Sequence, residues 1–256
     1  MRTGFGKLAA IVLGSSVMLA PAAAHASPLV FSGASGTHSA SVSFDVSGSN
    51  LLVTLSNTSA SDTLVPTDLL TAVFFTINGN PLLTRSSVVL GGGSSVENGT
   101  TDPGNVVGGE FAYLNGLATY GANAGISSSG LGIFGPGDVF PGSNLAGPAD
   151  PDGFQYGIAS AGDDPLTGNP SLLSEPLIMN SVLVTLGGLP SGFSLGRIGN
   201  VTFQYGTGLE EGHFGGDCRD CDGIQQIQAV PEPATLVLLG TGMIVSMRRA
   251  RRRLNS

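Results

Sequence analysis

Two cysteines and several carboxylates lie close together near the C-terminal side of the chain, where their spacing is suited to chemistry. The segment Asp217-Cys218-Arg219-Asp220-Cys221-Asp222-Gly223 holds both cysteines of the 256 residues. In an oxidising compartment, a Cys-x-x-Cys pair closes a disulfide loop more readily than it binds a metal. A zinc site would need two further ligands, and His213 could supply only one. A redox role would need the pair at a helix start in an α/β pattern, which is missing. We therefore expect a disulfide between Cys218 and Cys221.

The same segment carries three carboxylates, at Asp217, Asp220 and Asp222, followed by Gly223. Hard oxygen ligands that lie close together before a turn-forming glycine suit Ca²⁺. The spacing is not that of an EF-hand loop, because Gln228 stands where the glutamate at the twelfth position would lie. These residues are compatible with a Ca²⁺ site or with a solvated acidic loop, and the sequence indicates no other cofactor.

A G-x-S-x-G pattern at residues 192–196 places Ser194 where a hydrolase would carry its nucleophile. Such a serine needs a strand before it and a helix after it. The following residues, 197–205, predict a turn and a strand instead. All three histidines of the chain precede the acidic segment, so the chain order serine, acid, histidine has no candidate. We expect a protein without a catalytic role, with a hydrolase as an alternative.

An aromatic tetrapeptide, Phe-Gln-Tyr-Gly, occurs at residues 154–157 and again at residues 203–206. On a strand, the Phe and the Tyr of each copy point to the same face of the sheet. Two equivalent core strands would account for the echo. The alternative is a platform of Phe154, Tyr156, Phe203 and Tyr205 on which sugar rings stack, which would make the protein a carbohydrate-binding module.

The distribution of charge excludes several classes of function. The formal net charge of the whole chain is −8, but seven of its ten basic residues lie at the two ends. Between them, three arginines face 18 acidic residues, which leaves a charge of −15 and no lysine. Nucleic-acid binding needs clustered basic residues, so we expect no nucleic-acid partner. Schiff-base chemistry and phosphate-binding loops both need a lysine and are excluded as well.

Period-2 alternation of apolar residues predicts most of the elements that must position these groups. The pairs Val42/Phe44 and Leu51/Val53 lie on two strands joined at Gly48-Ser49-Asn50, and Asn78-Gly79 predicts a second hairpin turn after a strand at 73–77. Further strands are predicted at 87–90, 111–113, 154–158, 181–186 and 201–205. With 40 glycines and 15 prolines in the connectors, the pattern over residues 27–229 indicates an all-β sandwich or jelly-roll-like body with long loops.

The N-terminus has the pattern of a secretory signal peptide. Arg2 and Lys7 precede an apolar run at residues 8–20, and Ala24-His25-Ala26 fits the small-x-small cleavage pattern. The run is shorter than the roughly 20 helical residues that span a bilayer. We therefore predict that residues 1–26 are a signal peptide and that signal peptidase cleaves after Ala26.

The C-terminus has the pattern of a membrane anchor. Pro231, Glu232 and Pro233 precede an apolar run at 234–247, and a basic cluster follows at Arg248, Arg249, Arg251, Arg252 and Arg253. Positive charge is retained on the cytoplasmic side, so a transmembrane helix at 234–247 would leave the body outside. The run is short for a span, and snorkelling arginine side chains would help it to fit.

This order of parts, over residues 230–253, resembles the PEP-CTERM sorting signal of exosortase substrates. The body is also similar to surface proteins that carry this signal, at residues 51–59, 65–75 and 130–157. The resemblance implies an exported protein that is anchored in the membrane, processed by exosortase and placed on the cell surface or in the extracellular matrix. Exopolysaccharide is the partner expected there. The resemblance assigns no activity to the body.

The same C-terminal pattern has also been labelled an ice-binding-protein C-terminal domain. Ice binding usually needs flat arrays of regularly spaced threonines, and no such repeat occurs in this chain. We therefore do not infer ice binding from the resemblance.

Overall fold

A computed structural model describes residues 27–149, 151–219 and 221. These residues form an all-β body, which confirms the all-β part of the predicted fold class. The predicted signal peptide at 1–26 and the predicted transmembrane helix at 234–247 lie outside the described residues. Among the residues that are described, no helix is long and apolar enough to cross a membrane.

The strands are β1 Leu29–Ser35, β2 His38–Ser47, β3 Asn50–Asn57, β4 Leu70–Ile77, β5 Thr84–Leu90, β6 Ser95–Glu97, β7 Ala112–Asn115, β8 Ala124–Ser127, β9 Ile158–Ala159, β10 Leu177–Met179, β11 Ser181–Gly187, β12 Ile198–Tyr205 and β13 His213–Cys218. Short 3₁₀ turns are η1 Pro66–Asp68, η2 Gly108–Glu110, η3 Thr119–Gly121, η4 Pro136–Asp138 and η5 Leu195–Arg197.

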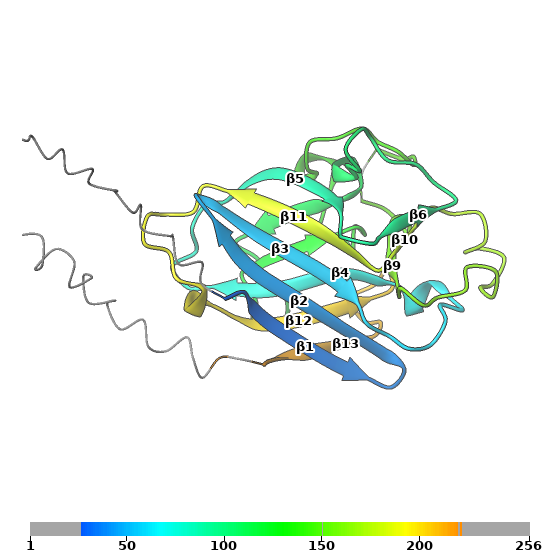
Figure 1. Ribbon diagram of the computed structural model, residues 1–256, viewed down its shortest axis with the longest axis horizontal. Helices are drawn as coiled ribbons and strands as arrows, with labels where there is room; N and C mark the ends of the chain where they lie inside the picture. The colour runs from blue at the N-terminus through cyan, green and yellow to red at the C-terminus, as the bar shows by residue number, and fades with distance from the viewer. Residues whose placement is uncertain (1–26, 150, 220, 222–256) are drawn as a thin grey trace, which may run out of the picture.

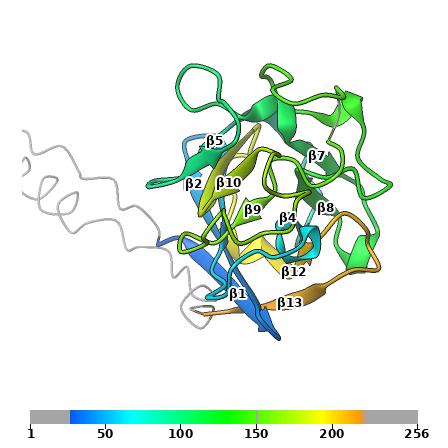
Figure 2. The same cartoon turned by 90° about the vertical axis from the view of Figure 1, so that its right-hand side faces the viewer.

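The strands form one sheet that curls until it is nearly closed (Figures 1 and 2). One half has the order β5-β11-β3-β2-β1, and the other runs β13-β12-β4 before it branches to β8-β7 and to β9-β10-β6. The ladder between β1 and β13 joins the two halves, with Phe31 opposite Cys218 and Ser32 opposite Asp217. The body is therefore barrel-like, instead of the two separate sheets of the predicted sandwich.

The predicted hairpin between residues 42 and 55 is confirmed. β2 and β3 are joined at Gly48 and Ser49, and they pair in a register that places Phe44 opposite Val53. Along both strands, inward side chains are buried and alternate with partly exposed ones. This alternation is typical of antiparallel strands with one face on a core and one face in solvent.

The predicted turn at Asn78-Gly79 is present, but the predicted hairpin is wrong, because the strands on its two sides do not pair with each other. β4 pairs with β12 and β8, whereas β5 pairs with β11. Gly79 has a φ of +88°, which glycine adopts without steric cost. The turn carries the chain from one half of the sheet to the other, because β4 pairs in the half that contains β12 and β5 pairs in the half that contains β11.

The predicted strand at 154–158 is also wrong over most of its length, since only Ile158 and Ala159 form a strand. Tyr156 lies in a turn with a φ of +54°. Its backbone N–H donates to the Pro176 carbonyl at 2.7 Å and its hydroxyl donates to the Thr100 carbonyl at 2.8 Å. These two bonds hold the ring in the core without a strand.

Aromatic side chains from the two halves of the sheet meet in the core. Phe44 of β2 lies edge to face with Phe31 of β1 at 6.1 Å and with Phe75 of β4 at 5.1 Å, measured between ring centroids. Phe44 and Phe75 have no exposed surface. Because β2 and β4 belong to opposite halves, this contact packs one side of the curled sheet against the other.

We expect Phe44→Ala to lower the free energy of unfolding by about 3–5 kcal/mol, because it removes a fully buried ring between the two halves. Urea unfolding of the purified chain followed by circular dichroism measures the change. Leu82→Ala is the matched control, since Leu82 is 80% exposed and should change stability by less than about 0.5 kcal/mol. Equal effects of the two substitutions would contradict this packing.

Candidate functional site

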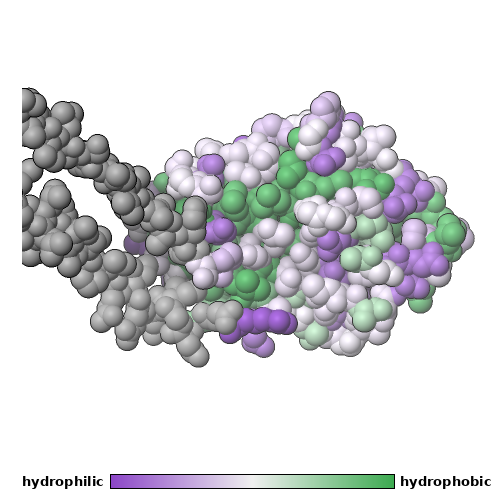
Figure 3. Space-filling model, in the orientation of Figure 1, coloured by the Kyte–Doolittle hydropathy of each residue, from purple (hydrophilic) through white to green (hydrophobic). Residues whose placement is uncertain are grey.

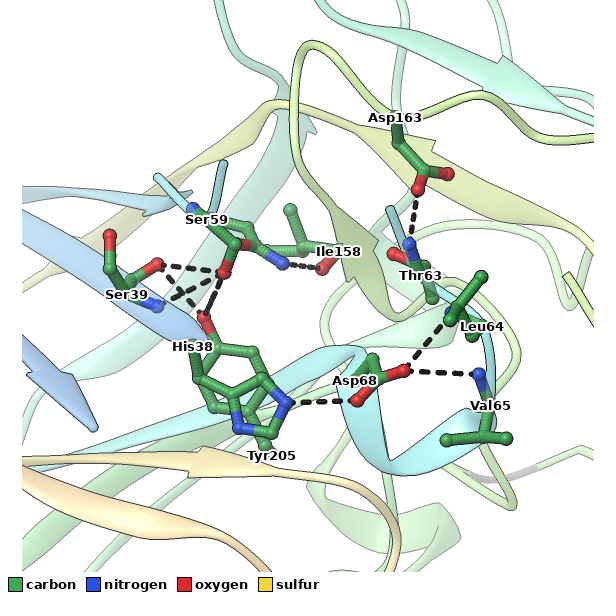
Figure 4. A network of polar contacts seen from close by, with 11 residues as sticks. His38, Ser39, Ser59, Thr63, Leu64, Val65, Asp68, Ile158, Asp163 and Tyr205 are labelled. Carbon is green, nitrogen blue, oxygen red and sulfur yellow. Dashed lines mark hydrogen bonds and ion pairs between the residues drawn. The ribbon is translucent and has the colours of Figure 1, made fainter. Parts of the chain in front are cut away.

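A polar network joins several loops at one end of the sheet, and it contains the closest pair of acid–base side chains (Figure 4). His38, at the start of β2, lies with Nε2 2.9 Å from Oδ1 of Asp68, which ends η1. The second oxygen of Asp68 accepts from the backbone N–H groups of Leu64 and Val65 at 3.0 and 3.1 Å. Asp68 therefore holds its own loop and the first residue of β2 together.

Tyr205 forms the inner side of this network. Its ring stacks on His38, with centroids 4.3 Å apart and planes 8° from parallel. Its hydroxyl lies 2.9 Å from the Ser39 carbonyl and 3.2 Å from Oδ1 of Asn57. Burial raises the pKa of Tyr205, so the hydroxyl stays protonated and serves as a donor.

A paired histidine and aspartate form two thirds of a hydrolytic triad, but within residues 27–149, 151–219 and 221 no serine, threonine or cysteine side chain is hydrogen-bonded to the His38 imidazole. Among the described residues, the only hydrogen bond of the His38 imidazole is the one to Asp68. Ser194 accepts from the Gly196 N–H at 3.3 Å and precedes the 3₁₀ turn η5 and then β12, with no helix after it. β12 separates Ser194 from the His38 end of the sheet by roughly 25 Å at strand rise. The geometry fits a structural pair that fastens loops.

The proposed aromatic platform does not exist. Tyr156, Phe203 and Tyr205 have no exposed surface, and Phe154 is partly buried against Leu69 and its neighbours. Phe203 and Tyr205 point from β12 into the core, where Phe214 lies 5.7 Å from each ring. Sugar stacking needs exposed ring faces, so the repeated tetrapeptide Phe-Gln-Tyr-Gly reflects core packing.

The cysteines and carboxylates of the C-terminal segment lie where β13 ends. Cys218 and Cys221 form a disulfide bond. Asp217 is exposed on β13, while Asp220 and Asp222 lie outside the described residues. His213 begins the same strand and is separated from Cys218 by roughly 17 Å at strand rise, too far for one zinc ion to bind both. Within the described ranges, no group of three His, Cys, Asp or Glu side chains is placed to hold a metal.

Exposed apolar side chains gather with acidic ones on the loops at the same end as His38. Leu64, Val65, Leu166 and Leu173 have exposed fractions of 39–84%. Figure 3 shows hydrophobic and hydrophilic residues side by side at this end of the molecule. Asp163, on the loop between β9 and β10, accepts a hydrogen bond from the backbone N–H of Thr63, on the loop between β3 and β4. These loops are fastened mainly through carboxylates and backbone N–H groups.

The burial of the Asp163 carboxyl makes stability depend on pH. Burial, followed by the nearby charges of Asp62 and Asp164, raises the pKa of Asp163 above its ordinary value, and the bond from Thr63 opposes the rise. A carboxyl whose pKa is raised by folding contributes stability below its unfolded pKa and loses it as the pH rises through the folded pKa. We expect Asp163→Asn, which keeps the acceptor oxygen, to flatten the fall of stability between pH 4 and neutral pH.

Urea unfolding of the wild type and the variant across this pH range measures the difference. Glu110→Gln provides an independent comparison of the pH dependence of stability. Glu110 lies on η2, away from Asp163, and burial raises its pKa as well. A difference between wild type and Asp163→Asn that stays constant with pH would contradict the assignment.

Comparison with known proteins bears on the C-terminus. Residues 229–253 match the family described as the PEP-CTERM protein-sorting motif. The matched segment includes Pro231, Glu232, Pro233 and the arginines at 248, 249, 251, 252 and 253. No curated protein and no solved structure matches the chain. The motif predicted from the order of Pro-Glu-Pro, apolar run and arginine cluster is confirmed, and the chain carries the sorting signal of exported, exosortase-processed surface proteins.

Proposed function

We propose that this protein is a non-catalytic component of the cell surface or extracellular matrix, sorted by exosortase and associated with exopolysaccharide. The observation that carries the proposal is the match of residues 229–253 to the PEP-CTERM protein-sorting motif. This motif implies export, a membrane-anchored stage and processing by exosortase. The absence of catalysis and the association with exopolysaccharide go beyond the motif.

The proposed route has three steps. Signal peptidase removes residues 1–26 after Ala26. The helix at 234–247 then holds the body at 27–229 outside the membrane, because the arginines that follow are retained on the cytoplasmic side. Exosortase finally cleaves near Pro231–Pro233 and separates the body from its anchor.

The body suits an exposed, hydrated location. Residues 27–232, between the two proposed cleavages, carry a charge of −15 and no lysine, so mutual repulsion would keep copies apart. Phe31 of β1 lies opposite Cys218 of β13, and the Arg219 N–H donates to the Val30 carbonyl at 3.0 Å. The chain therefore enters and leaves the body at one end, and the loops around His38 would face away from the membrane. In this location Ca²⁺ would bind at Asp217, Asp220 and Asp222.

Two other functions stay as alternatives. A carbohydrate-binding module would now need a site other than the buried aromatic rings. A hydrolase would need Ser194 or a carboxylate pair in a pocket, and an activity screen in which Ser194→Ala abolishes turnover would favour it over the proposed role.

Replacement of all five terminal arginines by glutamine should mislocalise the protein, because the helix loses the charge that stops its translocation. Cell fractionation and surface labelling measure the distribution. Arg197→Gln is the control, since Arg197 is exposed on the body and should leave sorting unchanged. Normal surface display of the five-arginine variant would sink the sorting proposal.

Intact-mass analysis of the protein isolated from the envelope should show Ser27 as the first residue and a C-terminus near Pro231–Pro233. The mass should also correspond to oxidised Cys218 and Cys221. Native mass spectrometry with and without a chelator then tests Ca²⁺. A mature protein that retains residues 234–253 would contradict cleavage of the anchor.

A further inference from the structure

A cleft of about 600 Å³ lies where the curled sheet fails to close. One wall comes from the start of β5 and the other from β7, and a segment around η4 forms the third side. β5 pairs with β11 at one end of the ladder path, whereas β7 pairs with β8 and ends the branch that leaves β4 (Figure 2). The lining includes Thr84, Arg85, Tyr113, Asn115, Asp138 and Phe140.

The charges in this cleft balance each other. Arg85 is one of three arginines that lie between the two basic ends of the chain, among 18 acidic residues. Its Nη1 donates to the Gly137 carbonyl at 3.0 Å and lies 3.7 Å from Oδ1 of Asp138. About a third of the Arg85 side chain and a quarter of the Asp138 side chain stay exposed, at 33% and 26%. The cleft therefore offers guanidinium donors and carboxylate acceptors together, with no net charge.

Tyr113 provides a second, independent observation. The residue is 4% exposed, and its hydroxyl is buried without a hydrogen-bond partner among the described residues. Burial raises the pKa of Tyr113 to about 12, so the group remains a neutral hydroxyl. An unpaired buried hydroxyl is costly, and most such groups in folded proteins have a partner. A ligand hydroxyl near Tyr113 at the wall of this cleft would supply one.

The third side of the cleft is held in place before any ligand binds. The Phe140 N–H donates to the Phe111 carbonyl at 2.9 Å, and the Ser143 N–H donates to Oδ2 of Asp102 at 2.7 Å. The buried carboxylate of Glu110 accepts from Leu145 and Ala146. A Cβ at Gly108 would lie 2.1 Å from the Pro141 carbonyl oxygen, so only glycine allows this close approach. A preformed wall lowers the entropy cost of binding.

We propose that this cleft binds a neutral saccharide, a ligand class that deepens the proposed association with exopolysaccharide and rests on it. Sugar hydroxyls both donate and accept hydrogen bonds, so they can use Arg85 and Asn115 as donors and Asp138 as an acceptor at once. The partly exposed apolar side chains of Leu114 and Val139 would cover the C–H face of a sugar ring. An anionic ligand would meet Asp138 and the negative field of the body, and a cationic one would meet Arg85.

The test uses the full chain in detergent and isothermal titration calorimetry. The probes are neutral hexasaccharides of glucose, mannose and xylose, with hexagalacturonate as the anionic probe and extended hexapeptides as the peptide probe. We expect at least one neutral hexasaccharide to bind. Arg85→Gln and Tyr113→Phe should each weaken that binding by roughly 3- to 10-fold, the loss of one hydrogen bond.

Tyr113→Phe also separates a binding role from a structural one. Removal of an unpaired buried hydroxyl should leave the urea midpoint unchanged or raise it, while binding falls. Tyr120→Phe is the matched control, because the Tyr120 hydroxyl is bonded to Gln204 at 2.7 Å and to Leu209 at 2.6 Å, outside the cleft. It should lower the midpoint and leave binding unchanged, and Arg197→Gln should change neither.

Three results would overturn the cleft assignment: no neutral saccharide binds, only the anionic or peptide probes bind, or the cleft variants bind as well as the wild type. Co-fractionation with exopolysaccharide in cells tests the wider function separately. If the wild type co-fractionates with exopolysaccharide but binds no neutral hexasaccharide, the cleft assignment is wrong and the wider function stands. If the wild type binds hexasaccharide but never co-fractionates, the wider function is wrong.

Discussion

The pairing of β1 with β13 is the constraint on which the rest of the body depends. A sheet edge exposes unpaired backbone groups that must find partners, and here the first and last described strands become each other's partners. This ladder turns two stacks of strands into one curled sheet, so that Phe44 and Phe75 can meet from opposite halves. It also leaves the remaining gap between β5 and β7, where the cleft lies.

Carboxylates fasten the loops of this body in a way that its charge composition requires. With three arginines and no lysine, few acidic side chains can form ion pairs, and the described part contains two, His38–Asp68 and Arg85–Asp138. Other carboxylates accept from loop N–H groups that lack a strand partner. Such acceptors are Asp68, Asp102, Glu110, Asp138, Asp163 and Glu211. The long glycine-rich connectors are thus ordered through side chain to backbone bonds.

β2 and β3 could be predicted from the sequence because their buried faces alternate with partly exposed residues, and β11 and β12 because they are rich in β-branched, aliphatic and aromatic residues. β8 could not, because Gly125 lies against Phe74 and its small residues carry no alternation. Asn78-Gly79 predicts a turn from local chemistry, but the partner of the next strand is set by packing far along the chain.

The cleft was beyond sequence analysis for a related reason. Arg85, Tyr113 and Asp138 lie on three separate segments and meet only through the sheet topology. The sole signal in the sequence was the rarity of Arg85 in an acidic body. The sorting motif, by contrast, was readable because all its parts are contiguous in the chain.

The position of β13 also has a mechanical consequence. β13 lies between β1 and β12 and ends at the disulfide-bonded Cys218, from which the chain continues toward its anchor. When the tail is held and the opposite end of the body is pulled, tension runs along β13 parallel to both neighbours. The hydrogen bonds on its two sides then share the load in shear, instead of opening one at a time like a zipper. A pull on the tail would therefore load this strand in shear rather than peel it from an edge of the sheet.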